Sequence, residues 1–277
     1  MITLVDYNTP TGIAGNYFDG KAIPLFNVYF NNYHVHYLRY LYYMCILNAE
    51  GEYPSEVDIE KIIHAFSMPK NSKCKPHIKK ILIGEAPPIN PVNYFYNPSP
   101  ASWSAAGRPA VGSTAWAGAI QTALFPGVLF ASKVDFLTAC AKKGFLLIDL
   151  FPYPIVYTST NSLKYKTALV NAFGSSATAY PYNLFAQLNN IKCCLSNEIA
   201  IGFGLKRIGN PILSNMLCVA DFTAWLLANG ITLIPFGGID LPRAIPAPVP
   251  LTSTFLRVCG RNGLFGPCPI LLNIAMI

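Results

Sequence analysis

Four short apolar runs, separated by segments of helical character, constrain the fold of this chain most strongly. Strands that alternate with helices predict βαβ units, so we expect an α/β fold. The architecture that we expect is a three-layer αβα arrangement around a central, mainly parallel four-stranded sheet. The runs are Ile81–Ile83, Phe145–Ile148, Ile199–Phe203 and Ile231–Ile234; the expected helices are Thr114–Leu124, Val134–Lys143, Ser162–Asn190 (broken near Gly174 and Pro181) and Pro211–Asn229, which Asn229-Gly230 would end.

Residues 1–75 lack this alternation and predict an N-terminal helical extension, followed by an α/β domain over 76–277. Within the extension, 27–48 is expected to include a helix. Ser55 and Asp58 form a capping-box pattern for a second helix. Its apolar face would comprise Val57, Ile59, Ile62, Ile63 and Phe66.

His34 and His36 stand two residues apart in the extension. On a strand they would share a face and could ligate a metal. No third ligand lies near them in the sequence, so we favour a structural role and expect no metal site.

The chain is 52% hydrophobic and only 12% charged, so a membrane protein must be weighed. The two long uncharged stretches, 109–132 and 167–191, contain proline, glycine and polar residues and make poor spanning helices. Asp6 interrupts the N-terminus, and no basic segment precedes an apolar core there, so no secretory signal is expected. We therefore expect a cytoplasmic protein without a membrane span.

Eight cysteines are present, and none forms a Cys-x-x-Cys pair. Zinc and iron–sulfur sites usually need such a pair. The expectation is that they are free thiols in a reducing compartment.

Charge is divided unevenly along the chain. Residues 1–60 carry a net charge of −5 and residues 61–277 a net charge of +12. A basic main part favours a polyanionic partner, with nucleic acid first. An ordinary basic surface is the alternative.

Acidic residues are scarce beyond residue 60, where only six occur, and two of them stand at the ends of apolar runs. Glu85 follows Gly84 after the first run, and Pro87 and Pro88 restrict the loop behind it. Asp149 ends the second run. Ligands bind at the carboxyl ends of strands in such sheets, where a fixed carboxylate can orient water as a general base. The alternatives are a solvated loop acid for Glu85, and a helix cap or lysine partner for Asp149.

An aromatic cluster, Tyr94-Phe95-Tyr96, follows the first run. Such rings can stack on a nucleobase, although packing in the core is their commoner role.

Together these residues resemble the uracil-DNA glycosylase superfamily over roughly residues 78–245. Gly84-Glu85-Ala86-Pro87 is similar to its water-activating motif, in the variant with Glu in second place. The resemblance implies that Phe95 or Tyr96 stacks on an extruded base and that Asp149, where the family often has Asn, reads the edge of the base. Some members have Asp at the position of Ala86, so the general base is Glu85 or, less favoured, Asp149.

The sequence departs from the family after the fourth run. Common members have a His there, whereas all four histidines of this chain precede the first run. Stabilisation of the departing base would then come from the backbone N–H groups of Gly237 and Gly238, or from a basic residue. Leu241 is the candidate wedge; Lys206, Arg207 and Arg243 are candidate phosphate contacts, or else ordinary surface cations.

Asp in place of Asn also bears on the substrate. An ionised Asp only accepts hydrogen bonds, which suits the N4 amino group of cytosine. A cytosine-derived base, either unmodified or modified as in viral DNA, therefore competes with uracil, and a role in antiviral defence stands beside DNA repair.

The expected function is that of a monofunctional DNA glycosylase, a hydrolase that flips a pyrimidine out of DNA and leaves an abasic site. We expect a monomer with DNA as its partner, needing neither metal nor cofactor. Two alternatives remain: a catalytically silent nucleic-acid-binding module on the same fold, and another α/β hydrolase or transferase acting on a small nucleotide.

Overall fold

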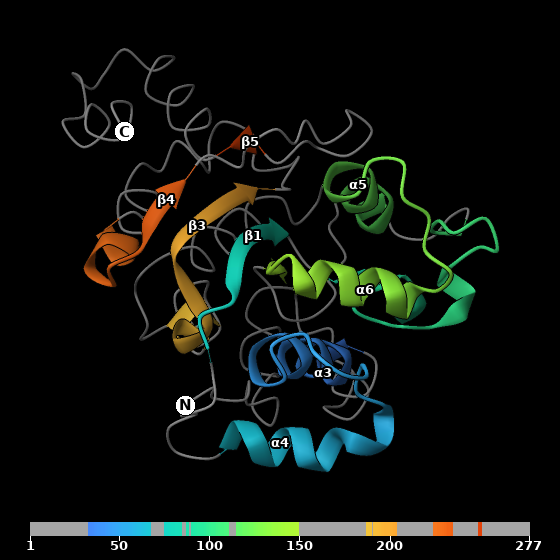
Figure 1. The fold of residues 1–277 in the computed structure, drawn as a ribbon, viewed down its shortest axis with the longest axis horizontal. Coiled ribbons are helices and arrows are strands. Elements are labelled where there is room, and N and C mark those ends of the chain that lie inside the picture. Colours follow the sequence, from blue (N-terminus) through green and yellow to red (C-terminus); the bar gives the residue numbers. More distant parts are fainter. Residues whose placement is uncertain are drawn as a thin grey trace, which may run out of the picture.

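Parallel strands form the centre of the structure (Figure 1). The computed structural model describes residues 33–67, 75–84, 87–88, 90–110, 115–149, 187–189, 191–203, 224–234 and 249–250. The strands run in the order β2-β1-β3-β4 with every neighbouring pair parallel, and β5 pairs antiparallel with β3. Their bounds are β1 Ile78–Gly84, β2 Phe145–Asp149, β3 Leu195–Phe203, β4 Thr232–Ile234 and β5 Val249–Pro250.

All four predicted strands are confirmed. The apolar runs of β1 and β2 are continuous because helices cover this part of the sheet, so β1 is buried from Ile81 to Gly84 and β2 from Phe145 to Ile148. The edge strand β4 is more open, since Ile234 is 39% exposed. The fold is therefore a mixed α/β fold in which helices flank a parallel sheet.

The helices between the first two strands also lie where the sequence predicts them. Ser132 caps α6, and Asp135 completes the capping box by accepting from the Ser132 backbone. The helical elements are α3 Val35–Leu41, η2 Tyr42–Ile46, η3 Glu56–Asp58, α4 Ile59–Ser67, η4 Pro91–Asn93, η5 Pro100–Ser102, α5 Ala115–Leu124, α6 Lys133–Lys142 and η7 Lys192–Cys194.

The two later predicted helices fall only partly on described residues. Residues 187–189 and 224–228 are helical. The predicted stop at Asn229-Gly230 is confirmed: Gly230 has φ +67°, and its N–H bonds back to the Leu227 carbonyl.

The N-terminal helices pack into the same core as the sheet. Tyr40 of α3 donates a hydrogen bond to the Phe145 carbonyl at the start of β2, and one cluster of buried side chains joins α3, α6 and the strands. α4 packs on α3 (Figure 1). The described part of the extension thus covers the sheet, and a domain boundary near residue 75 stays a prediction.

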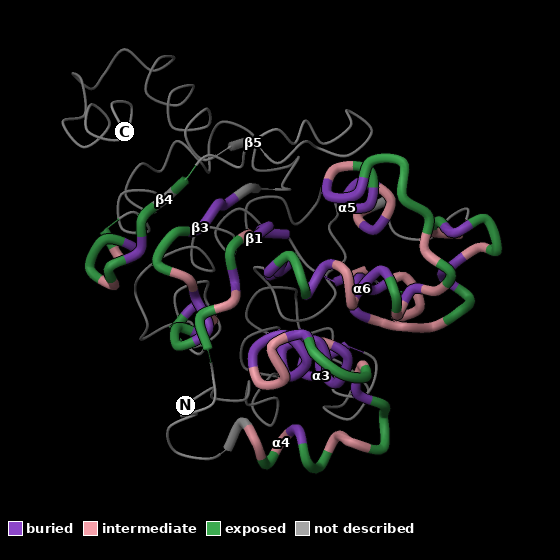
Figure 2. The backbone as a smooth tube through the Cα atoms, viewed as in Figure 1, coloured by how far each residue is buried: buried purple, intermediate pink, exposed green. Residues whose placement is uncertain are grey.

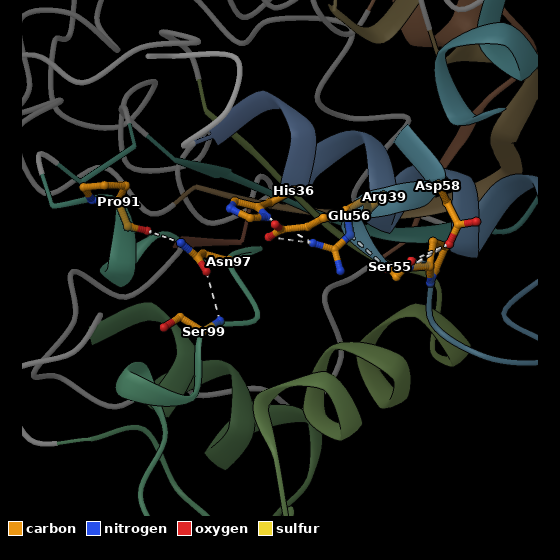
Figure 3. Close-up of polar contacts among 9 residues, drawn as sticks. His36, Arg39, Ser55, Glu56, Asp58, Pro91, Asn97 and Ser99 are labelled. Atoms are coloured by element: carbon orange, nitrogen blue, oxygen red, sulfur yellow. Dashed lines mark hydrogen bonds and ion pairs between the residues drawn. The ribbon is translucent and has the colours of Figure 1, made fainter. Parts of the chain in front are cut away.

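The capping box of Ser55 and Asp58 is confirmed (Figure 3). The assignment of Val57 to the apolar face is wrong, since Val57 is 90% exposed. Residues 56–58 form a 3₁₀ turn, and the α-helix begins only at Ile59, so Val57 does not share the buried side of α4.

None of the helices in the described residues combines the length and hydropathy needed to cross a bilayer. Cys45, Cys140 and Cys193 are free, but Cys194 is disulfide-bonded, which corrects the expectation that the cysteines are free thiols.

Candidate functional site at the carboxyl ends of β1 and β2

Gly84 and Asp149 are register partners at the carboxyl ends of the neighbouring parallel strands β1 and β2. A β-carbon added to Gly84 would stand 2.3 Å from Asp149 Oδ1. The carboxylate therefore occupies the space that a side chain on Gly84 would need. Only glycine lets the strand end approach Asp149 so closely.

The strand order places this pair beside a topological switch point. From β1 the chain passes first to β2 on one side and later to β3 on the other. In open α/β sheets, ligands bind outside the carboxyl ends of the strands at such a point. The end of β1 at Gly84 lies at that position.

The loop after β1 is held by the N-terminal helix layer. Tyr33 donates a hydrogen bond to the Pro88 carbonyl at 2.8 Å, and Pro87 is buried. Tyr33 also makes an edge-to-face contact with Tyr94, at 5.3 Å between ring centroids. A residue 55 positions away thus fixes the loop that the sequence singled out.

Asn97 orders the next part of this connection (Figure 3). Its amide donates to the Pro91 carbonyl at 2.9 Å and accepts from the backbone N–H of Ser99 at 2.9 Å. The segment 90–100 therefore has a defined path between β1 and the helices that follow.

Tyr37, on α3, is a second tyrosine of the N-terminal layer that lies near the site. Burial raises the pKa of the Tyr37 hydroxyl above its ordinary value, and the nearby Cys45 and Asp149 raise the pKa further. The hydroxyl is therefore neutral, and it lies within electrostatic range of Asp149. An un-ionised phenol can donate a hydrogen bond, whereas an ionised carboxylate can only accept one.

Sequence reasoning missed Tyr33 and Tyr37. With Tyr40 they stand at i, i+4 and i+7, a spacing that brings side chains onto one face of a helix. That periodicity was the available signal, although it does not reveal which strand end the face meets.

Phe95 and Tyr96 lie in the core, each only 1% exposed. Phe95 makes edge contacts with Phe136 and Phe145, and Tyr96 both donates to the Leu147 carbonyl and accepts from the Leu147 N–H. The structure therefore does not support the prediction that one of them stacks on a base. Both rings pack in the core between α3, α6 and β2, which is the commoner role of such a cluster.

The remaining predicted site residues lie outside the described residues: Glu85, Ala86, Lys206, Arg207, Gly237, Gly238, Leu241 and Arg243. Of these, Glu85 is the residue that directly follows Gly84.

His34 and His36 are buried on helical backbone, not on a strand. Two residues apart on a helix, they do not share a face. Burial lowers the pKa of His34 to about 3; burial, with the nearby charges of Arg39 and Lys133, lowers the pKa of His36 to about 4. Both rings are therefore neutral at pH 7. No group of three or more metal-ligating side chains occurs within the described ranges.

Arg39 is a buried charged residue of α3, and its side chain has polar partners. Its Nε donates to the Pro54 carbonyl at 2.9 Å, and one Nη lies 3.4 Å from Glu56 Oε1 and 3.5 Å from His36 Nδ1 (Figure 3). The cluster joins α3 to Pro54 and to η3, the turn that precedes α4, and this role is structural.

Lys133 is a buried cation that sequence reasoning also missed. Its Nζ donates to the Tyr94 carbonyl at 2.8 Å, and burial lowers its pKa to about 7. The contact ties the first residue of α6 to the aromatic segment and so to the loop beyond β1.

The described part of the site thus combines a carboxylate, a strand-end glycine and tyrosines from the N-terminal layer. Such a carboxylate can accept hydrogen bonds from amino or imino groups of a ligand at the sheet edge. Models of known protein families, curated proteins and solved structures were all compared with the chain, and none matches it.

Proposed function

We propose that the protein is a monofunctional DNA glycosylase of the uracil-DNA glycosylase type, acting as a monomer in the cytoplasm. The observation that carries the proposal is the juxtaposition of Gly84 and Asp149 at the carboxyl ends of β1 and β2. Glu85 follows Gly84 directly, so two of the few acids of the main part of the chain belong to neighbouring strand ends. The three-layer αβα arrangement expected from the sequence is part of this proposal.

In the proposed reaction the target nucleotide is flipped out of the DNA, because its glycosidic bond is out of reach within the stack. Glu85 orients a water molecule and takes its proton as the oxygen attacks the sugar carbon. The glycosidic bond breaks, its electron pair leaves with the base, and an abasic site remains. Neither a metal nor a cofactor takes part.

Groups beyond the described residues complete the proposal. Backbone N–H groups of Gly237 and Gly238 stabilise the departing base. Leu241 fills the gap left in the stack, and Lys206, Arg207 and Arg243 contact phosphates.

The proposed substrate base is a cytosine derivative, with uracil as the competitor. Asp149 only accepts hydrogen bonds when ionised, and the N4 amino group of cytosine is the donor that such a group matches. Modified cytosines occur in viral DNA, which makes antiviral defence one setting for this activity and DNA repair the other.

A base-release screen tests the proposal. Oligonucleotides that carry a single uracil, cytosine or 5-substituted cytosine are incubated with the full chain, and free base and abasic sites are measured. We expect release of a cytosine-type base and loss of release in Glu85→Gln, which keeps the size of the side chain but removes its basicity. Release of uracil alone contradicts the proposed base specificity but leaves the proposed reaction in place.

The missing histidine favours one second candidate, a catalytically silent nucleic-acid-binding module. All four histidines precede β1, so none follows the fourth strand in the sequence. Tight DNA binding without release of any base would support this candidate. Activity on a free nucleoside but not on polymer would instead indicate a hydrolase or transferase of small nucleotides.

A further inference from the structure

Four lysines lie together where α6 ends and β1 begins: Lys79, Lys80, Lys142 and Lys143, the lysine surface. Lys79, Lys142 and Lys143 are exposed and Lys80 is half-buried. Figure 2 shows the exposed end of α6 near β1. The lysine surface is at the amino end of the sheet, away from the proposed catalytic edge.

Gly144 holds these lysines together. The backbone N–H groups of Lys79 and Lys80 both donate to the Gly144 carbonyl, at 2.9 and 3.0 Å. Gly144 has φ +65°, and a β-carbon there would stand 2.3 Å from the His77 carbonyl. The junction therefore brings the backbones of the two lysine pairs close together.

Among the described residues, no acidic side chain compensates the charges of the lysine surface. Within the described ranges none of the four lysines forms an ion pair. Burial lowers the pKa of Lys80, and the neighbouring charges of Lys143 and Lys79 lower it further. Like charges held together in this way repel one another, and a polyanion would relieve the repulsion.

A pocket of about 510 Å³ adjoins the lysine surface through Phe125. The Lys143 ammonium lies 5.2 Å from the centroid of the Phe125 ring, and Phe125 lines the pocket. Val128 and Leu129 also line it and are 44% and 57% exposed. Arg108 adds a further cation at its wall. Its volume and mainly apolar lining leave room for one flat ring to pack against it.

Gln121 supplies a fixed polar group in this pocket. It is only 6% exposed, and its amide nitrogen donates to the carbonyls of Gly107 and Val128, at 3.0 and 2.8 Å. Both amide protons are thereby used, so Oε1 has a set orientation. Among the described residues Oε1 has no hydrogen-bond partner, which leaves it as an acceptor for a ligand N–H.

We propose that the lysine surface and this pocket bind single-stranded nucleic acid, with phosphates on the lysines and one base in the pocket. Phosphates match the clustered cations, and a base has both the flat apolar body and the N–H donor that the pocket fits. A single strand is the form that offers an unstacked base at low cost. This binding surface is independent of the glycosylase activity proposed above.

The proposed contacts between the lysines and the phosphates are tested by fluorescence anisotropy. A fluorescein-labelled oligothymidylate is titrated with the protein over a series of salt concentrations. The test variant is Lys142→Gln/Lys143→Gln. The control is Lys61→Gln, at an exposed position of α4. Each lost phosphate contact lowers the slope of log affinity against log salt by about 0.7 on a single strand, so we expect a fall of about 1.4. An unchanged affinity and slope in the double variant would overturn the assignment of the lysine surface.

The base-binding half is tested at Gly118, which lines the pocket from α5. A β-carbon there meets only Pro109 Cγ, at 3.9 Å, so Gly118→Ala fits and serves as the control, while Gly118→Leu fills the pocket. We expect Gly118→Leu to weaken binding about fivefold or more, with an unchanged salt slope, as for loss of one base contact. Equal affinities of the two variants would overturn the assignment of the pocket.

An anionic membrane is the rival partner. If the double lysine variant loses binding to phosphatidylserine vesicles but keeps its affinity for the oligonucleotide, the proposal is wrong and the surface is a lipid-binding one. A failure of this inference is therefore distinguishable from a failure of the glycosylase proposal, which base release alone decides.

Discussion

Asp149 Oδ1 lies 2.3 Å from the point where a β-carbon on Gly84 would stand. Because the two residues are register partners on parallel strands, the carboxylate lies over the end of β1. The next residue is Glu85. The space that this glycine leaves open is what lets the Asp149 carboxylate approach the end of β1 so closely.

Replacement of Gly84 by alanine tests this relationship. The added methyl group would overlap the carboxylate, so we expect a loss of stability of about 1–3 kcal/mol and a loss of base release. Urea unfolding measures the first effect. Gly118→Ala is the matched control, since its β-carbon meets only Pro109. Equal unfolding midpoints for the two variants would contradict the close approach of Asp149.

Tyr33 is expected to position the loop that follows Glu85, the residue we propose as the general base. Tyr33→Phe removes the hydrogen bond to the Pro88 carbonyl, which should cost about 1 kcal/mol of stability and lower the rate of base release. Tyr43→Phe is the matched control, because the Tyr43 hydroxyl also donates to a backbone carbonyl, that of Ala49, away from the loop. Similar stabilities with reduced release only in Tyr33→Phe would support the positioning role. Equal release rates would count against it.

Asp149→Asn should change the base that is preferred. An amide both donates and accepts, so we expect weaker release of cytosine-type bases and stronger release of uracil. The ratio of the two release rates is the measurement. Asp135→Asn is the control, since Asp135 caps α6 and its loss should lower stability without moving this ratio. A ratio unmoved by Asp149→Asn would remove Asp149 from base recognition.

The buried histidines predict an acid-sensitive fold. The pKa of His34 is about 3 and that of His36 about 4 in the folded state, whereas an unperturbed histidine has a pKa of about 6.5. Below pH 6.5 the unfolded chain therefore binds more protons than the folded one. Stability should therefore be fully present above pH 6.5 and fall as the pH drops toward 4. The double variant His34→Gln/His36→Gln should lose part of this slope, whereas His64→Gln at an exposed position should keep it. Urea unfolding from pH 7 to pH 4 compares the three chains; identical slopes would show that the histidines are not held neutral.

Much of the parallel sheet could be predicted from the sequence, and for a physical reason. A strand buried on both faces needs a nearly continuous apolar run, so Ile81–Ile83 and Phe145–Ile148 are visible without coordinates. The capping pattern of Ser55 and Asp58 is equally local. The position of Asp149 beside the first strand end also follows from the parallel pairing of the two runs.

Features that depend on tertiary contacts could not be predicted in this way. The sequence does not distinguish an aromatic ring that packs in the core from one that stacks on a base. It therefore predicts a stacking role for Phe95, which lies in the core. The role of Tyr33 depends on a contact across 55 positions, and the exposure of Val57 depends on where a 3₁₀ turn becomes an α-helix. Such contacts are set by the packing of whole elements and leave little local trace.

The central claim is that Glu85, next to the strand end that Asp149 covers, activates water for cleavage of a glycosidic bond. The most direct test compares base release by the unchanged chain and by Glu85→Gln. The substrates are oligonucleotides with a single uracil, cytosine or 5-substituted cytosine, at concentrations where both chains bind the same amount of DNA. We expect release by the unchanged chain and a loss of about 10²–10⁴-fold in the variant, the usual contribution of a general base. Release that persists undiminished in Glu85→Gln, or no release of any base by the unchanged chain, would contradict the account.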